Sequence, residues 1–200
     1  MIRITSGEFR GRTLKTPPGD RTRPTQARLR QALFNSLQTA IPEARVLDLF
    51  AGSGALGFEA LSRGATQVVA VEKAKGAVEL IRVNAQTLRC ADRMKVLGGD
   101  CEDLWEAMLA AGPFDLVLAD PPYAGGFELK LLALPFWERL LAPDGLFCLE
   151  WGRQKSSVEE LPDETPFLVK VREKTYGDSV LSTYRRKGAS GDGGGEVSEG

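Results

Sequence analysis

Histidine is absent from the 200 residues, which excludes catalytic triads built on histidine and metal sites with histidine ligands. Cysteine is scarce: Cys90, Cys101 and Cys148 lie far apart and form no C-x-x-C pair. Reduced thiols are therefore expected, rather than a disulfide or a zinc site. The sequence predicts no metal centre.

Long apolar runs are also missing. No stretch approaches the roughly 20 apolar residues that cross a bilayer, and the first residues, M-I-R-I-T, lack the apolar core of a signal peptide. We expect a soluble, cytoplasmic protein with no membrane partner, most simply a monomer. With 42% hydrophobic residues, the chain can form one substantial core, so a single α/β domain is the default expectation.

Charge is nearly balanced overall, at −1, but it is unevenly distributed. Residues 1–30 carry eight basic and two acidic side chains, whereas residues 188–200 carry three acidic side chains and no basic one. A basic arm on a near-neutral body suggests a polyanionic partner; the alternative is a solvated arm with dispersed charge. The glycine-rich, acidic residues 188–200 are expected to be disordered.

The amino-terminal residues predict a small hairpin. G-E-F-R-G-R is flanked by Ile2 and Ile4 on one side and by Thr13 and Leu14 on the other, and residues 15–24, rich in proline and glycine, form an expected loop. A helical pattern then runs from Thr25 to Pro42. We expect three segments: a basic hairpin and loop at 1–24, a catalytic domain at 25–187 and the tail at 188–200. Five arginines are candidates for contact with nucleic-acid phosphates: Arg10, Arg12, Arg23, Arg28 and Arg30.

Apolar strands and amphipathic helices alternate through the middle of the chain, which predicts a Rossmann-like parallel sheet covered on both faces. The expected strands are 46–50, 67–71, 94–97, 114–119 and 146–150. The expected helices are 55–63, 74–89, 102–111, 127–141 and a short one near 156–161. Two further strands, 167–173 and 180–186, are joined by K-T-Y-G-D-S and predict an antiparallel pair at one edge.

A glycine turn follows the first of these strands. Gly52, Gly54 and Gly57 in V-L-D-L-F-A-G-S-G-A-L-G satisfy G-x-G-x-x-G, and Glu72 ends the next strand. This is the dinucleotide fingerprint, with an acid placed to bind ribose hydroxyls. Asp48, four residues before Gly52, favours a ligand with a positive charge over a pyrophosphate. The electrostatics therefore favour S-adenosylmethionine over NAD, although Asp48 as a simple cap of the turn is an equal alternative.

A second motif, Asp120-Pro121-Pro122-Tyr123, follows the strand at 114–119. Two prolines remove two N–H donors and fix the turn, which leaves acceptors beside an aromatic ring. Such a group suits a flat ring that carries an NH₂ group, because the acceptors bind the amino hydrogens and Tyr123 stacks on the face. A rigid surface turn is the alternative. In a doubly wound sheet the two strands are neighbours, so both motifs are expected at one crevice.

Together these motifs resemble class I S-adenosylmethionine-dependent methyltransferases that modify exocyclic amino groups. The narrower resemblance, over residues 2–186, is to the RsmD family of 16S rRNA (guanine-N2)-methyltransferases. It rests on R-I-T-S-G-E-F-R-G-R-T-L, T-R-P-T-Q-A-R-L-R-Q-A-L-F-N, the glycine turn and Y-G-D-S-V-L-S-T-Y-R. The family implies a seven-strand sheet, mostly parallel with an antiparallel last strand, and a 16S rRNA substrate, free or in a small-subunit assembly particle. The segment R-C-A-D at 89–92 departs from many relatives.

The resemblance also implies site residues. Asp120, Pro121, Pro122 and Tyr123 would hold the target guanine and form the catalytic group. Asp48, Gly52 and Gly54 would contact the methionine part of the cofactor, Glu72 its ribose, and Asp100 and Cys101 its adenine. Phe50, Ala51, Lys73 and Asp120 complete the expected cofactor site. The alternatives are a DNA adenine-N6 methyltransferase, an NAD-dependent oxidoreductase and a non-catalytic RNA-binding protein.

Overall fold

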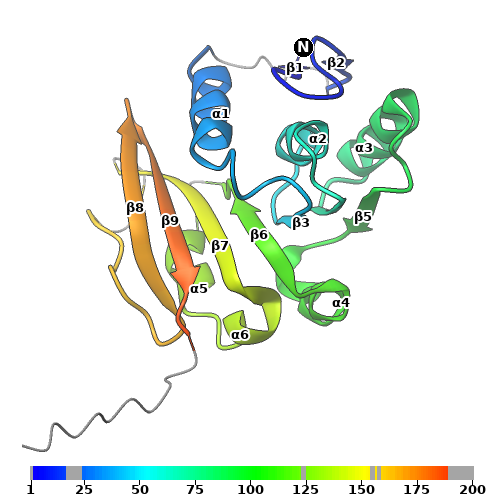
Figure 1. The fold of residues 1–200 in the computed structure, drawn as a ribbon. Coiled ribbons are helices and arrows are strands. Elements are labelled where there is room, and N and C mark those ends of the chain that lie inside the picture. The colour runs from blue at the N-terminus through cyan, green and yellow to red at the C-terminus, as the bar shows by residue number, and fades with distance from the viewer. Residues whose placement is uncertain (1, 17–23, 123–124, 154–155, 157–158, 189–200) are drawn as a thin grey trace, which may run out of the picture.

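The computed structural model describes residues 2–16, 24–122, 125–153, 156 and 159–188. Its centre is a seven-stranded sheet in the order β5-β4-β3-β6-β7-β9-β8 (Figure 1). The strands are β3 (Arg45–Asp48), β4 (Gln67–Glu72), β5 (Met94–Gly98), β6 (Phe114–Ala119), β7 (Leu141–Gly152), β8 (Leu168–Tyr176) and β9 (Ser179–Arg186). Neighbours from β5 to β7 are parallel, and β9 is antiparallel to both β7 and β8. This confirms the predicted fold class.

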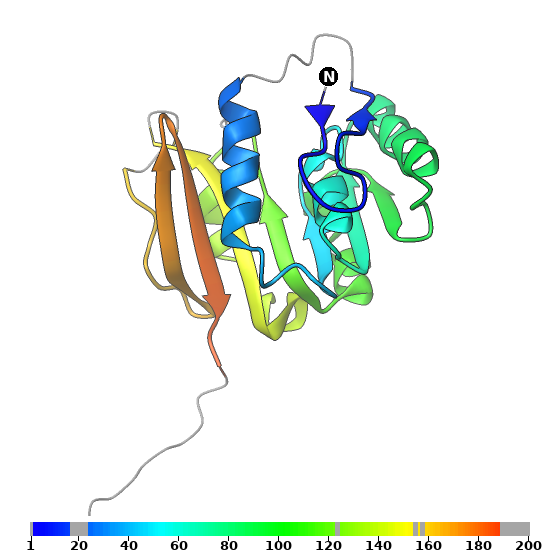
Figure 2. The same cartoon turned by 45° about the horizontal axis from the view of Figure 1, so that its top comes forward.

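Helices cover both faces of the sheet (Figures 1 and 2). One face carries α1 (Pro24–Ser36), α2 (Ala55–Ser62) and α3 (Lys75–Leu88); the other carries α4 (Trp105–Ala111), α5 (Phe127–Leu132) and α6 (Trp137–Leu140). A 3₁₀ turn, Cys101–Asp103, precedes α4. Each face has its own apolar cluster, because side chains alternate between the faces along each strand. Within the described residues, no helix is long and apolar enough to cross a membrane.

The small amino-terminal hairpin, β1 (Ile2–Arg3) paired with β2 (Thr13–Leu14), is present as predicted and packs on α2 (Figure 2). Buried Glu59 of α2 accepts the Thr5 N–H at 2.9 Å and pairs with Arg63. Gly7 adopts φ +78° so close to Ser62 that an added Cβ would lie 1.6 Å from the Ser62 carbonyl oxygen. The hairpin is therefore fixed against the body of the protein.

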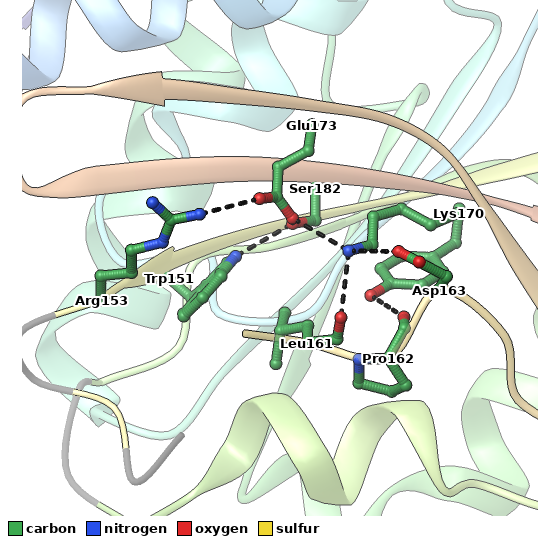
Figure 3. Close-up of polar contacts among 9 residues, drawn as sticks. Trp151, Arg153, Leu161, Pro162, Asp163, Lys170, Glu173 and Ser182 are labelled. Atoms are coloured by element: carbon green, nitrogen blue, oxygen red, sulfur yellow. Dashed lines mark hydrogen bonds and ion pairs between the residues drawn. The ribbon is translucent and has the colours of Figure 1, made fainter. Parts of the chain in front are cut away.

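Two helix predictions are wrong. The expected helix at 127–141 is two short helices, because Pro135 cannot donate to the helical ladder and clashes with the preceding turn, and β7 already begins at Leu141. The expected helix near 156–161 is absent: described residues 156 and 159–161 are irregular. In Figure 3 the Leu161 carbonyl instead accepts from Lys170 Nζ at 3.0 Å and the Pro162 carbonyl from the Tyr184 hydroxyl at 2.9 Å.

Candidate functional site

The glycine turn connects β3 to α2 at the carboxyl edge of the sheet. Gly52 has φ +52° with open space where a Cβ would stand, and Gly54, at φ +78°, precedes the first turn of α2. Gly57 lies inside α2, where an added Cβ would approach Val68 Cγ1 to 2.9 Å. The first two glycines therefore shape the turn, and the third allows close packing of helix and strand.

Glu72 ends β4 beside this turn. Its carboxylate accepts the Gly52 N–H at 2.8 Å and the Ala74 N–H at 2.6 Å, so two backbone donors orient it. Each carboxylate oxygen has further acceptor capacity. Glu72 is thus held in place with lone pairs still available to a ligand's hydroxyl groups.

A pocket of about 350 Å³ opens next to Glu72. Phe50 and Phe127, in edge contact with ring centroids 5.3 Å apart, line it together with Cys101 and Asp100. Lys73 pairs with Asp100 at 2.7 Å, and this hydrogen bond lowers the pKa of the Asp100 carboxyl. The combination of aromatic and acidic groups suits a nucleoside: an apolar slot for a base and carboxylates for its hydroxyl and amino hydrogens.

A second pocket, of about 180 Å³, adjoins the first, because Phe50 and Gly52 line both. Asp120, Glu150 and Arg30 line the second pocket. The predicted convergence of the glycine turn and the Asp120 turn at one crevice is therefore present in the structure. Pro122 lines the first pocket; Tyr123 lies outside the described residues.

Asp48 is fully buried beneath the turn. Its Oδ2 accepts the Gly57 N–H at 3.3 Å, and its Oδ1 has no hydrogen-bond partner among the described residues. Burial is the main cause that raises the pKa of Asp48 to about 7, and the charge of Asp120 adds to it. Asp48 therefore caps the backbone after the turn through Oδ2, whereas its Oδ1 receives no hydrogen bond from the described residues.

Replacing Asp48 should change how stability depends on pH. The pKa of about 7 in the folded protein exceeds the usual value of 3.8, so the folded state binds more protons between those values. The free energy of unfolding contributed by Asp48 therefore decreases as pH rises through that window, by about 1 kcal/mol per pH unit. Asp48→Asn cannot titrate, so wild type should lose stability relative to the variant between pH 4 and 7. Denaturant unfolding at several pH values measures this; a difference independent of pH contradicts it.

Asp120 directly follows β6, and Glu150 lies near the carboxyl end of the neighbouring strand β7. Ala119 of β6 pairs with Leu149 of β7, so the two acids follow side by side at the carboxyl edge. Burial raises the pKa of both carboxyls, and the charge of Asp120 raises that of Glu150 further. The sequence alone assigns Glu150 to a strand but to no site. The available signal was an acidic residue at the end of the expected strand 146–150, which is the next strand along the chain after D-P-P-Y.

The predicted phosphate-binding arginines differ in exposure to solvent. Arg10, Arg12 and Arg28 are exposed, and Arg12 also donates to the Thr87 carbonyl at 3.3 Å. Arg30 is only 8% exposed: its Nη2 donates to the Arg3 carbonyl at 3.1 Å, and its Nε has no partner among the described residues. Arg30 thus belongs to the pocket of Asp120 rather than to the outer surface. Arg23 lies outside the described residues.

No metal centre is evident in the described part of the chain, where no group of three or more cysteine, aspartate or glutamate side chains could hold an ion. The candidate site consists of two adjoining pockets, one whose lining suits a nucleoside and one lined by Asp120 and Glu150.

The model of the family described as "Conserved hypothetical protein 95" matches residues 2–185. The chain belongs to this family. Ribosomal RNA small subunit methyltransferase D of Escherichia coli is 34% identical over 188 residues, which cover 94% of this chain and 91% of that protein. Its Haemophilus influenzae counterpart is 34% identical over 185 residues, 92% of each chain. Family membership thus confirms the resemblance to RsmD proteins seen in the sequence.

A solved structure leads to the same family. That of yhhF from Escherichia coli superposes with a TM-score of 0.79 at 34% identity, covering 94% of this chain and 99% of that chain. The crevice described above therefore belongs to a fold shared by a family member over its full length.

Proposed function

We propose that this protein transfers a methyl group from S-adenosylmethionine to the exocyclic N2 of one guanine in small-subunit rRNA. The observation that carries the proposal is the junction of the two pockets at Phe50 and Gly52, which brings a nucleoside-shaped slot next to the Asp120 turn. Relatives named for methylation of small-subunit rRNA share this fold and most of this chain's length.

The residues of the crevice fit S-adenosylmethionine, which supplies a methyl group already activated by a sulfonium charge. Glu72 would accept the ribose hydroxyls, and Asp100 and Cys101 would lie by the adenine. Gly52 leaves open space at the turn. Asp48 is buried beneath the turn with its Oδ1 unpartnered among the described residues, and its carboxylate would attract a positively charged ligand. Buried carboxylates disfavour a pyrophosphate, so the site favours this ligand over NAD.

Asp120 and the two prolines would hold the guanine. The amino nitrogen of guanine is a weak nucleophile because its lone pair is delocalised into the ring. Hydrogen bonds from N2–H to the Asp120 carboxylate and the Pro121 carbonyl would orient the nitrogen and stabilise the positive charge that develops on it. The target base must leave any duplex to reach this pocket.

The docked hairpin would position the RNA. Arg10 and Arg12 are exposed on it, and Arg28 is exposed on α1. Because the hairpin is fixed to α2, phosphates bound there would lie at a constant distance from the crevice. Affinity for rRNA should therefore fall steeply as salt concentration rises, by roughly tenfold or more between 50 and 200 mM.

Methyl transfer to undermethylated rRNA tests the proposal. Purified protein, labelled S-adenosylmethionine and 16S rRNA or small subunits from cells that lack the enzyme should yield a single N2-methylguanine, located by mass spectrometry of nuclease fragments. Calorimetric titration with S-adenosylmethionine and NAD should show binding of the former alone. Methylation of DNA adenine instead, or no binding of S-adenosylmethionine, would contradict the assignment.

A further inference from the structure

The turn between β8 and β9 carried part of the family resemblance but has no role in the function proposed above. Tyr176 pairs with Ser179 across this turn, and Gly177 adopts φ +60°. The Ser179 hydroxyl donates a hydrogen bond to Glu150 Oε1 at 3.2 Å. The turn therefore fixes a side chain of the neighbouring strand, β7.

Glu150 faces the same pocket as Asp120. The last paired residues of β6 and β7 are Ala119 and Leu149, and the two acids come next on their strands. Both line the pocket of about 180 Å³ that adjoins the nucleoside slot. A substrate amine that reaches Asp120 therefore also lies beside Glu150.

The charges around Glu150 are mostly negative. Asp120 faces it from the end of β6, Arg30 from α1, and Glu128 of α5 lines a small cleft together with it. On β9 the adjacent group is the uncharged Ser179 hydroxyl. Burial and the charge of Asp120 raise the pKa of Glu150 to about 8. Two buried neighbouring carboxyls do not ionise independently, and near neutral pH the two together hold about one proton.

We propose that Glu150 and Asp120 form an acid pair that receives the proton leaving the target nitrogen. This inference rests on the proposed function. As the N–C bond forms, the S–C bond breaks and its electrons stay on sulfur, which leaves a positive charge on nitrogen. One N–H bond then breaks, its electron pair returns to nitrogen, and the proton passes to a carboxylate oxygen of the pair. Water later removes the proton.

The acid pair predicts that the rate of methyl transfer rises with pH in two steps, one for each carboxyl that ionises. In wild type, the first yields one carboxylate and the second yields two beside the developing charge. Glu150→Gln keeps the size of the side chain and a hydrogen-bond acceptor for Ser179, but leaves only Asp120 to ionise. Asp120 ionises before Glu150, so the ionisation that remains in the variant is the lower of the two.

Single-turnover methyl transfer from pH 5.5 to 9 tests this inference. The rate of wild type should rise in two steps with pH, whereas the rate of Glu150→Gln should show only the lower of these two steps. The variant should be about tenfold slower at pH 8.5 and close to wild type at pH 6, with little change in KM for rRNA. A ratio of rates that stays constant with pH, or equal rates at pH 8.5, overturns the inference.

Carboxyl titration by ¹³C NMR on the free protein tests the pair without turnover. The pKa of Glu150 should fall in Asp120→Asn, because the charge of Asp120 raises it in wild type, and Ser179→Ala should raise the pKa of Glu150 because the lost hydrogen bond favours the ionised form. A Glu150 titration that Asp120→Asn leaves unchanged overturns the pair. If wild type shows the coupled titration but methylates no rRNA, the proposed function fails and the acid pair stands.

Glu173→Gln is a matched control, shown in Figure 3. Glu173 Oε2 also accepts from a serine of β9, Ser182, at 2.9 Å. Ser182 in turn accepts from Trp151 Nε1 at 3.0 Å, and Trp151 points to the sheet face opposite Glu150. Glu173→Gln should therefore keep the two-step pH profile of wild type. Loss of that profile in the control would mean that strand packing, not the acid pair, sets it.

Discussion

Asp120→Ala should reduce single-turnover methyl transfer by about 10²- to 10³-fold while the affinity for S-adenosylmethionine changes little. The physical reason is that the bond from N2–H to Asp120 strengthens as positive charge develops on nitrogen, so its loss affects the transition state more than the ground state. Asp120 lines the pocket next to the nucleoside slot rather than the slot itself. Rapid-quench kinetics and calorimetric titration with S-adenosylmethionine measure the two quantities separately.

Asp115→Asn is the control for this variant. Asp115 lies on the same strand, β6, but is exposed, and its Oδ2 accepts the Arg45 N–H at 2.8 Å, a contact that asparagine's carbonyl oxygen can keep. Its turnover should equal that of wild type. Unchanged turnover in Asp120→Ala would remove Asp120 from the mechanism, and a parallel loss of S-adenosylmethionine affinity would assign it to donor binding.

Gly7→Ala should destabilise the protein by on the order of 3 kcal/mol and displace the hairpin. The added Cβ would lie 1.6 Å from the Ser62 carbonyl oxygen, which is backbone and cannot rotate away, and φ is +78°. Thermal unfolding should occur roughly 10 °C lower. Filter binding should also show weaker retention of rRNA, since the arginines of the hairpin lose their fixed position.

Gly11→Ala separates the clash from backbone strain. Gly11 lies in the same hairpin at φ +83°, but nothing stands within 4 Å of an added Cβ. Its cost should be only about 1 kcal/mol, from the left-handed conformation alone. Equal losses in the two variants would show that docking of the hairpin on α2 contributes nothing measurable.

Local patterns were sufficient for much of the fold. The apolar runs of β3, β4 and β6 are buried on both faces, so they are continuous in the sequence and easy to recognise. The glycine turn and Asp120 could be placed together because strand order in this fold makes β3 and β6 neighbours. What required the structure was contact between segments far apart in the chain.

Three features show the limit of the sequence. In the sequence, Glu150 resembles any polar residue at a strand end. Only the structure shows its hydrogen bond from Ser179 and its position beside Asp120. Arg30 resembles an exposed helix residue, yet its guanidinium turns toward the Arg3 carbonyl in the pocket. The irregular segment that ends at Pro162 is fixed by side chains of β8 and β9 rather than by its own propensity.

One helix connects the glycine turn to the amino-terminal hairpin. The eight residues of α2, Ala55–Ser62, begin at Gly54 of the donor turn and end at Ser62, where Gly7 and Phe9 of the hairpin are attached. At 1.5 Å per residue, α2 measures about 12 Å. Under the proposed function, a nucleotide bound at the hairpin and a base presented to the crevice are held at this fixed spacing, so we expect the shape of the folded RNA to determine the target as much as the identity of the base.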